Sequence, residues 1–74
     1  MSGVFAKNLR RILAAEDITQ KMLSEWSGVP RRTIESWIAG REPGAEKLMR
    51  VAHVLRRPMD DFFKEEGHVG DEKY

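Results

Sequence analysis

The sequence predicts an all-α fold, a compact bundle of five helices. Apolar residues recur at helical spacing in successive segments between residues 4 and 63. Glycine or proline stands at most of the joints between these segments. A chain of 74 residues buries about 60% of its unfolded surface, which supplies one helical core but no roomy ligand chamber in addition.

The first helix is expected over residues 4–16, with its lysine and arginine side chains mostly outside. The second is expected over residues 20–27, where Thr19 is a suitable N-cap because its hydroxyl can accept a hydrogen bond from a first-turn N–H. Gly28 should end this helix in a left-handed conformation, which glycine adopts without steric cost. The inward stripe of the first helix consists of Phe5, Leu9, Ile12 and Leu13.

A third helix is expected over residues 31–39, stopping at Gly40, and a fourth over residues 45–56. The inward face of the fourth consists of Leu48, Val51, Ala52 and Leu55. Pro58 should begin a short fifth helix, whose first turn carries the negative charges that a helix N-terminus favours.

The aromatic residues divide between core and surface. Trp37 belongs to the apolar set and is expected in the core, and Trp26 is expected to be partly buried. Phe62 and Phe63 are adjacent on a helix and cannot share one inward direction. One of these two phenylalanines is therefore a candidate contact in a homodimer.

Residues 20–40 form the most informative segment. Leu23, Val29, Ile34 and Trp37 would give two short helices a common inner face, and the small Ser24 falls where these helices cross most closely. The second helix opens with two adjacent arginines. Because cations there oppose the helix dipole, they indicate an anionic partner. This pattern is typical of a helix-turn-helix and predicts binding to double-stranded DNA.

Charge is distributed unevenly along the chain. Residues 1–57 hold eleven Lys or Arg against six Asp or Glu, and residues 58–74 hold two against six. The basic part fits a phosphate-bearing partner. We expect a DNA-binding domain over residues 1–64 and an acidic, flexible tail over residues 65–74, either solvated or in contact with another protein.

Other classes find little support in the sequence. The absence of cysteine, of a secretory signal and of a membrane-spanning apolar run favours the cytoplasm and no membrane. His53 and His68 lack further ligands at useful spacing, so no metal is expected. No phosphate-binding glycine loop or nucleophile elbow occurs, which predicts no enzyme, no cofactor and no small-molecule ligand.

Over about residues 4–63 the chain resembles the Cro and phage-repressor, or XRE-like, family. The resemblance lies in ITQKMLSEWSGVPRRTIESWIAGREP and in LMRVAHVL followed by MDDFF. It implies a lambda-repressor-like bundle of five helices whose third helix enters the major groove. Matching positions imply base reading by Arg31, Arg32 and Ser36, and phosphate contacts by Gln20, Thr33 and Arg41.

The chain departs from the family pattern in three ways. Pro30 replaces the usual capping Ser or Thr, so the third helix needs another cap or begins with Pro30 itself. Leu13 and Ile38 replace an Arg and a Glu that often pair between the first and third helices. Because both are apolar, the change looks compensated. Arg57 stands where an apolar residue is more usual.

Two functions follow as hypotheses. The first is a sequence-specific transcriptional regulator, a repressor that binds a palindromic operator as a homodimer. The second is an antitoxin or antirepressor, a protein-interaction module on the same scaffold, which the acidic tail and the aromatic pair would serve.

Overall fold

A computed structural model describes residues 3–64, and the predicted acidic tail at residues 65–74 lies outside the described residues. The described range contains four α-helices and one 3-10 helix: α1 Val4–Glu16, α2 Gln20–Ser27, α3 Arg31–Ile38, α4 Ala45–Leu55 and η1 Met59–Phe63. The all-α prediction is confirmed, and the predicted bounds of the first two helices agree with the structure.

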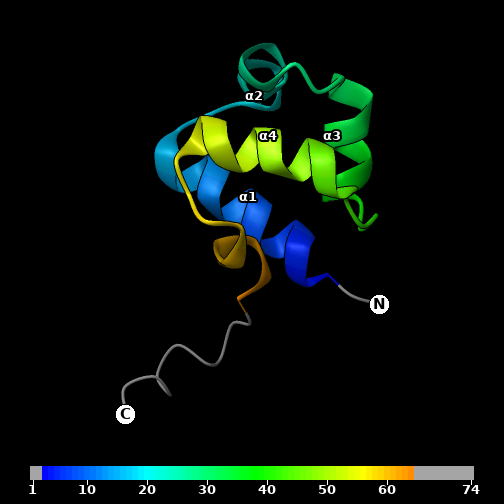
Figure 1. Cartoon of the computed structure of the whole chain (residues 1–74), viewed down its shortest axis with the longest axis vertical. Helices are drawn as coiled ribbons and strands as arrows, with labels where there is room; N and C mark the ends of the chain where they lie inside the picture. The colour runs from blue at the N-terminus through cyan, green and yellow to red at the C-terminus, as the bar shows by residue number, and fades with distance from the viewer. Residues whose placement is uncertain (1–2, 65–74) are drawn as a thin grey trace.

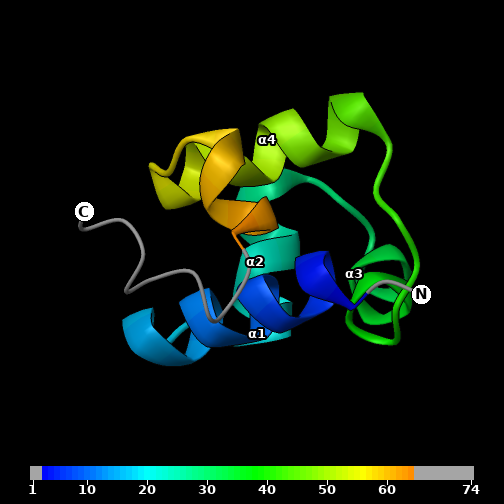
Figure 2. The ribbon, with the colours of Figure 1, turned by 90° about the horizontal axis from the view of Figure 1, so that it is seen from below.

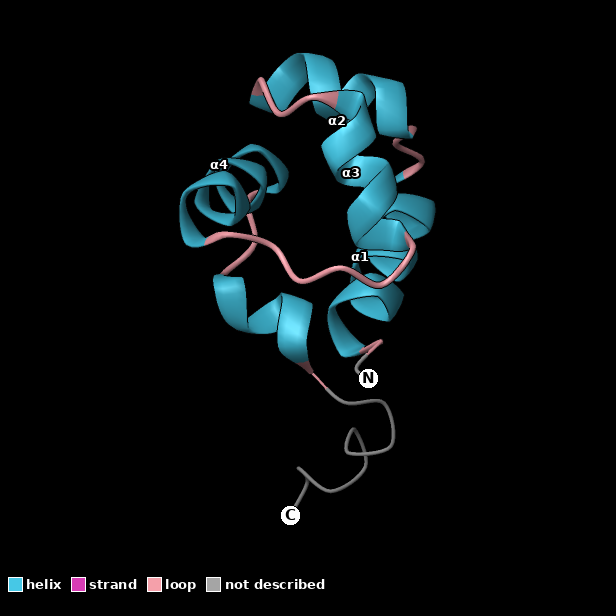
Figure 3. Ribbon diagram, turned by 90° about the vertical axis from the view of Figure 1, so that its right-hand side faces the viewer, coloured by secondary structure: helices cyan, strands magenta, loops and turns pink. Residues whose placement is uncertain are grey.

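The helices surround a single core. α4 crosses in front of α1 in Figure 1, and the view from below places these two helices on opposite sides of the molecule (Figure 2). α1 packs against α3 and η1, whereas α2 packs against α3 and α4. α3 thus lies at one end of the bundle, and Figure 3 views the molecule from that end.

Each of the apolar residues predicted to face inward is buried. Phe62 joins them from η1 and is completely enclosed. The rings of Phe5 and Trp37 meet edge to face, with centroids 5.5 Å apart, which links α1 to α3. The confirmed core residues are Phe5, Leu9, Ile12, Leu13, Leu23, Val29, Ile34, Trp37, Leu48, Val51, Ala52 and Leu55.

The predicted short fifth helix is present, but it is a 3-10 helix and not an α-helix. Met59–Phe63 form a 3-10 helix, in which the N–H of Asp61 donates to the carbonyl of Pro58 at 3.0 Å. Five residues are too few for several i to i+4 bonds, and short segments commonly adopt the tighter i to i+3 pattern. The segment nevertheless places Phe62 in the core, as a helical turn would.

The ends of the later helices differ from the prediction by one residue. α3 stops at Ile38, with Ala39 as its C-cap. α4 stops at Leu55 because Arg56 adopts a left-handed conformation with φ of 57°. In α2 both predicted signals are confirmed: the Thr19 hydroxyl accepts from the Met22 N–H, and Gly28 has a φ of 78°.

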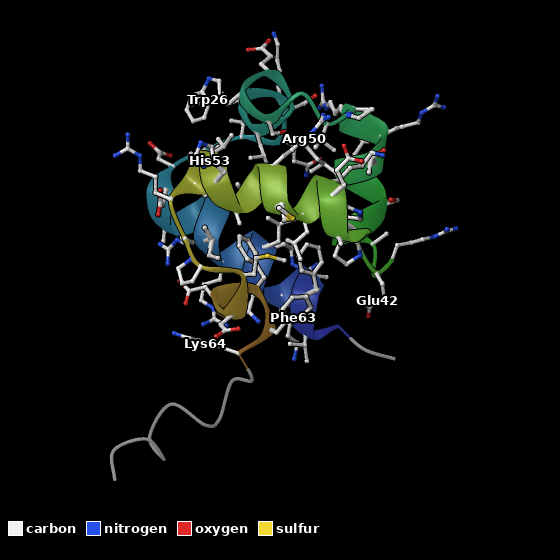
Figure 4. All side chains as sticks on the ribbon, viewed as in Figure 1. Trp26, Glu42, Arg50, His53, Phe63 and Lys64 are labelled. Atoms are coloured by element: carbon white, nitrogen blue, oxygen red, sulfur yellow. The ribbon has the colours of Figure 1, made fainter. Side chains whose placement is uncertain are left out.

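The aromatic predictions had mixed outcomes. Trp37 is buried, but Trp26 is 52% exposed, so its predicted partial burial was wrong. α2 turns Leu23 and Ser27 inward, which leaves Trp26 projecting from the end of the helix (Figure 4). Of the two phenylalanines, Phe62 is in the core and Phe63 is 44% exposed. Of the two residues predicted as candidates for a dimer contact, Phe63 is therefore the one on the surface.

Two polar clusters attach η1 to α1. The buried Asn8 side chain donates to the carbonyls of Phe62, at 3.2 Å, and of Lys64, at 2.7 Å. Arg57 forms ion pairs with Glu16, at 2.7 Å, and with Asp61, at 3.3 Å. The hydrogen bonds that the Arg57 guanidinium donates to the Glu16 carboxylate raise the pKa of Arg57. An ion-pair cluster thus occupies the position where an apolar residue is more usual.

Candidate nucleic-acid interface

Two serine side chains fix the turn between α2 and α3. The Ser24 hydroxyl donates to the Val29 carbonyl at 2.7 Å, and the Val29 N–H donates to the Ser27 hydroxyl oxygen at 3.2 Å. The Ser27 hydroxyl in turn donates to the carbonyl of Leu23. Sequence reasoning assigned only a small size to Ser24 and missed Ser27. These bonds satisfy polar groups of the turn within the protein and tie Val29 to the end of α2, two residues before α3 begins.

α3 begins without a side-chain cap. Pro30 occupies the N-cap position with φ of −56° and ψ of 142°, and its carbonyl accepts from the N–H groups of Thr33 and Ile34. The expectation of a replacement cap, or of Pro30 as the first helical residue, was therefore wrong. The first N–H groups of an uncapped helix remain available to an anion.

The outer face of α3 carries the charged side chains. Successive residues on a helix are about 100° apart, so Arg31, Arg32, Glu35 and Ser36 lie on the side opposite the buried Ile34 and Trp37. Arg32 is exposed and has no ion pair with any residue from 3 to 64. Three predicted base-reading residues, Arg31, Arg32 and Ser36, are therefore on one face.

Arg31 and Ser36 already have partners within α3. The Nε of Arg31 lies 3.4 Å from a carboxylate oxygen of Glu35. The Ser36 hydroxyl donates to the Thr33 carbonyl at 2.7 Å. With its proton engaged there, the Ser36 oxygen still has lone pairs to accept a hydrogen bond from a base. Thr33 itself is half-buried on the same helix.

The remaining predicted phosphate contacts come from the segments on either side of α3. Gln20 is the first residue of α2 and is half-buried. Arg41 is exposed and follows Gly40, which has a φ of 118°. The Arg41 N–H donates to the Ser36 carbonyl at 3.0 Å, so the end of α3 determines where the backbone of Arg41 lies.

α1 and α3 are joined differently from the family pattern. Leu13 and Ile38 line one surface groove together with Arg10 and Gln20. The Arg10 guanidinium donates to the Ile38 carbonyl at 3.0 Å. Sequence reasoning assigned Arg10 only to the exposed side of the first helix. Contact between Leu13 and Ile38 stays a prediction, but both side chains line this groove.

The family model described as helix-turn-helix matches residues 9–62. The chain therefore belongs to the XRE/Cro-like helix-turn-helix family, with the lambda-repressor-like fold, as the resemblance implied. This domain family binds DNA and is not catalytic. Neither a curated protein nor a solved structure matches the chain. Among the described helices, none has both the length and the apolar character needed to cross a membrane.

Proposed function

We propose that the protein is a sequence-specific transcriptional regulator, a repressor that reads double-stranded DNA with α3 in the major groove. One observation carries the proposal. α3 buries Ile34 and Trp37 in the core and presents two exposed arginines, Arg31 and Arg32, on its outer face. A rigid helix with guanidinium groups on one side fits the width of the major groove and can donate hydrogen bonds to the acceptor groups of its bases.

The face divides into residues that read and residues that position. Arg31 and Arg32 can each donate two hydrogen bonds to guanine O6 and N7, and Ser36 can accept from an amino group of a base. Phosphate contacts from the flanking segments and from the uncapped start of α3 would fix the register of the helix on the duplex. Gln20, Thr33 and Arg41 are the side chains proposed for these phosphate contacts.

A homodimer on a palindromic operator completes the proposal. One recognition helix reads only a few base pairs, too few to define a single operator in a genome. Two copies would read half-sites roughly 34 Å apart on the same face of the duplex. Phe63 lies below α4 in Figure 4, and its exposed ring is the proposed centre of the dimer contact. A dimer bound across a promoter would block transcription by occupancy.

Selection from a pool of random double-stranded DNA, carried out with the full chain, tests this function directly. We expect enrichment of an inverted repeat whose half-sites are one helical turn, or a multiple of it, apart. Recovery of single half-sites would support sequence-specific DNA binding but contradict the proposed homodimer. If no sequence were enriched above the starting pool, the proposal of a sequence-specific regulator would be wrong.

The antitoxin or antirepressor function is the second candidate, and the exposed apolar side chains favour it. Trp26, Met49, Met59 and Phe63 are all exposed, and such side chains can contact a protein partner. A protein-interaction module would bind random and selected DNA equally weakly. The selection experiment therefore distinguishes the two functions, because only the regulator enriches a defined sequence.

A further inference from the structure

Glu35 lies on the outer face of α3. At about 100° per residue, Arg32 lies nearest the point opposite the buried Ile34 and Trp37, Glu35 and Ser36 flank it on either side, and Arg31 lies at the edge beyond Glu35. The outer face therefore carries an exposed carboxylate beside its two arginines. A carboxylate at this place repels phosphates, so its presence on a DNA-reading face calls for a specific function.

Stabilisation of the fold does not explain why Glu35 lies on this face. The Arg31 and Glu35 side chains are 58% and 55% exposed, and their closest atoms are 3.4 Å apart. Exposed ion pairs of this spacing on a helix add little to folding because water screens them and both side chains lose rotational freedom. The pair does, however, orient Arg31. The carboxylate lies beside Nε, and among residues 3–64 neither Nη group has a hydrogen bond, so both can donate to a base.

We propose that Arg31 and Glu35 read DNA as one unit, with Arg31 on a guanine and Glu35 on a neighbouring cytosine. This inference depends on the proposed function. A carboxylate only accepts hydrogen bonds, and the N4 amino group of cytosine is a major-groove donor that it can recognise. Guanine and thymine present acceptors and repel it. Adenine places its N7 acceptor beside the amino group, which disfavours a carboxylate relative to cytosine.

The spacing on α3 fits two neighbouring bases. Glu35 lies one helical turn beyond Arg31, a rise of about 6 Å along the helix axis. Successive bases along one DNA strand are about 3.4 Å apart. The Glu35 contact should therefore fall on the same base pair as the Arg31 contact, or within about two pairs of it.

Glu35 also has an expected effect on DNA of the wrong sequence. Removing its negative charge should strengthen binding to random DNA, because electrostatic attraction to phosphates supplies nearly all of that binding. The same removal should weaken binding to the selected site. A residue needed only for folding would weaken both.

The experiment compares the base preferences of four proteins by selection from one random pool: the parent, Glu35→Ala, Glu35→Gln and the control Glu46→Ala. Glu46 forms an exposed ion pair with Arg50 on α4, with the same i to i+4 spacing and a separation of 3.3 Å. The control therefore loses the same kind of pair away from α3. Thermal melts of all four proteins report folding independently of DNA.

We expect the parent to require cytosine at one position in each half-site, close to the Arg31 guanine. Glu35→Ala should reduce the preference for cytosine over other bases at this position by roughly 5- to 150-fold. It should also bind random DNA about threefold more tightly at low salt. Glu35→Gln should change the preference to adenine, since an amide pairs with adenine N6 and N7. The control should keep the parent's sequence.

Two negative results can be told apart. If the parent selects no sequence, the proposed function fails and this inference fails with it. If the parent and the control select one sequence and both Glu35 variants select it unchanged, only the Arg31 and Glu35 reading unit is overturned. Glu35→Gln keeps the test valid if Glu35→Ala melts too low to assay.

Discussion

The guanidinium of Arg10, on α1, donates a hydrogen bond to the carbonyl oxygen of Ile38 across 3.0 Å. Ile38 is the last residue of α3, so the bond satisfies a carbonyl that has no partner within the helix and places a cation at the negative end of the helix dipole. Where the family often pairs two side chains, this chain joins α1 to α3 through a backbone oxygen. The bond therefore ties the end of the proposed recognition helix directly to α1.

The apolar pair beside this junction can be tested by reintroducing charge. Leu13→Arg should lower the free energy of unfolding by ~3 kcal/mol, because Leu13 is buried and Arg10 already brings a positive charge to the same groove. Adding Ile38→Glu should restore part of that loss. Thermal melts measure both variants. A double variant less stable than Leu13→Arg would contradict the view that the two apolar residues jointly replace an ion pair.

Base reading and phosphate anchoring should respond differently to truncation. Arg32→Ala should weaken binding to the best site by ~1–3 kcal/mol and relax the preference at one base pair. Arg41→Ala should weaken binding to all sequences about equally and reduce the salt slope by about 1. Titrations on selected and random DNA at several salt concentrations measure these effects. If Arg32→Ala lost equal affinity for selected and random DNA, Arg32 would contact the DNA phosphates and not a base.

The adjacent phenylalanines should separate dimerisation from folding. Phe63→Asp should leave a folded monomer that binds the palindromic site weakly, since the Phe63 ring is 44% exposed and stacks only against Phe5 at 5.7 Å among the described rings. Phe62→Asp should cost at least about 3 kcal/mol of stability, because Phe62 is fully buried. Sedimentation and melting distinguish the outcomes. If Phe63→Asp remained a dimer with unchanged operator affinity, Phe63 would not be part of the dimer interface.

The charge cluster at η1 predicts a pH dependence of stability. Asp61 accepts from Lys64 at 3.1 Å and from Arg57 at 3.3 Å, and these hydrogen bonds hold the pKa of Asp61 below its ordinary value of 3.8. A carboxylate with a lowered pKa in the folded state stabilises the fold above its unfolded pKa. That contribution is lost as the pH falls through the folded value.

Asp61→Asn should therefore be less stable than the parent by about 0.5–1 kcal/mol at pH 7, and the difference should vanish as the pH falls below 3.8. Urea unfolding at a series of pH values measures it. Asp60→Asn, which removes the same charge from the same turn, serves as the control. A constant difference between Asp61→Asn and the parent at all pH values would show that the cluster does not act through charge.

The sequence by itself determined the helices and the core of this protein. The bounds of α1 and α2 follow from local signals, namely apolar spacing, the Thr19 cap and the left-handed Gly28, each of which acts within a few residues. The twelve apolar residues predicted to face the core follow from the same periodicity, and all of them are buried. The resemblance, carried mainly by residues 18–43, also identified the family, because its pattern of small, glycine and apolar positions lies within one continuous segment.

The tertiary structure alone decided which side chains meet across the fold. Asn8 bonds to carbonyls 54 and 56 residues away, and Arg10 reaches a carbonyl 28 residues away, distances in sequence for which spacing offers no signal. The choice between Phe62 and Phe63 and the 3-10 form of Met59–Phe63 likewise depend on how the last segment packs against α1 and α4. The exposure of Trp26 depends on how α2 packs against α3 and α4. Local patterns specify helices through short-range bonds, whereas these features are settled only when separate helices compete for the same core.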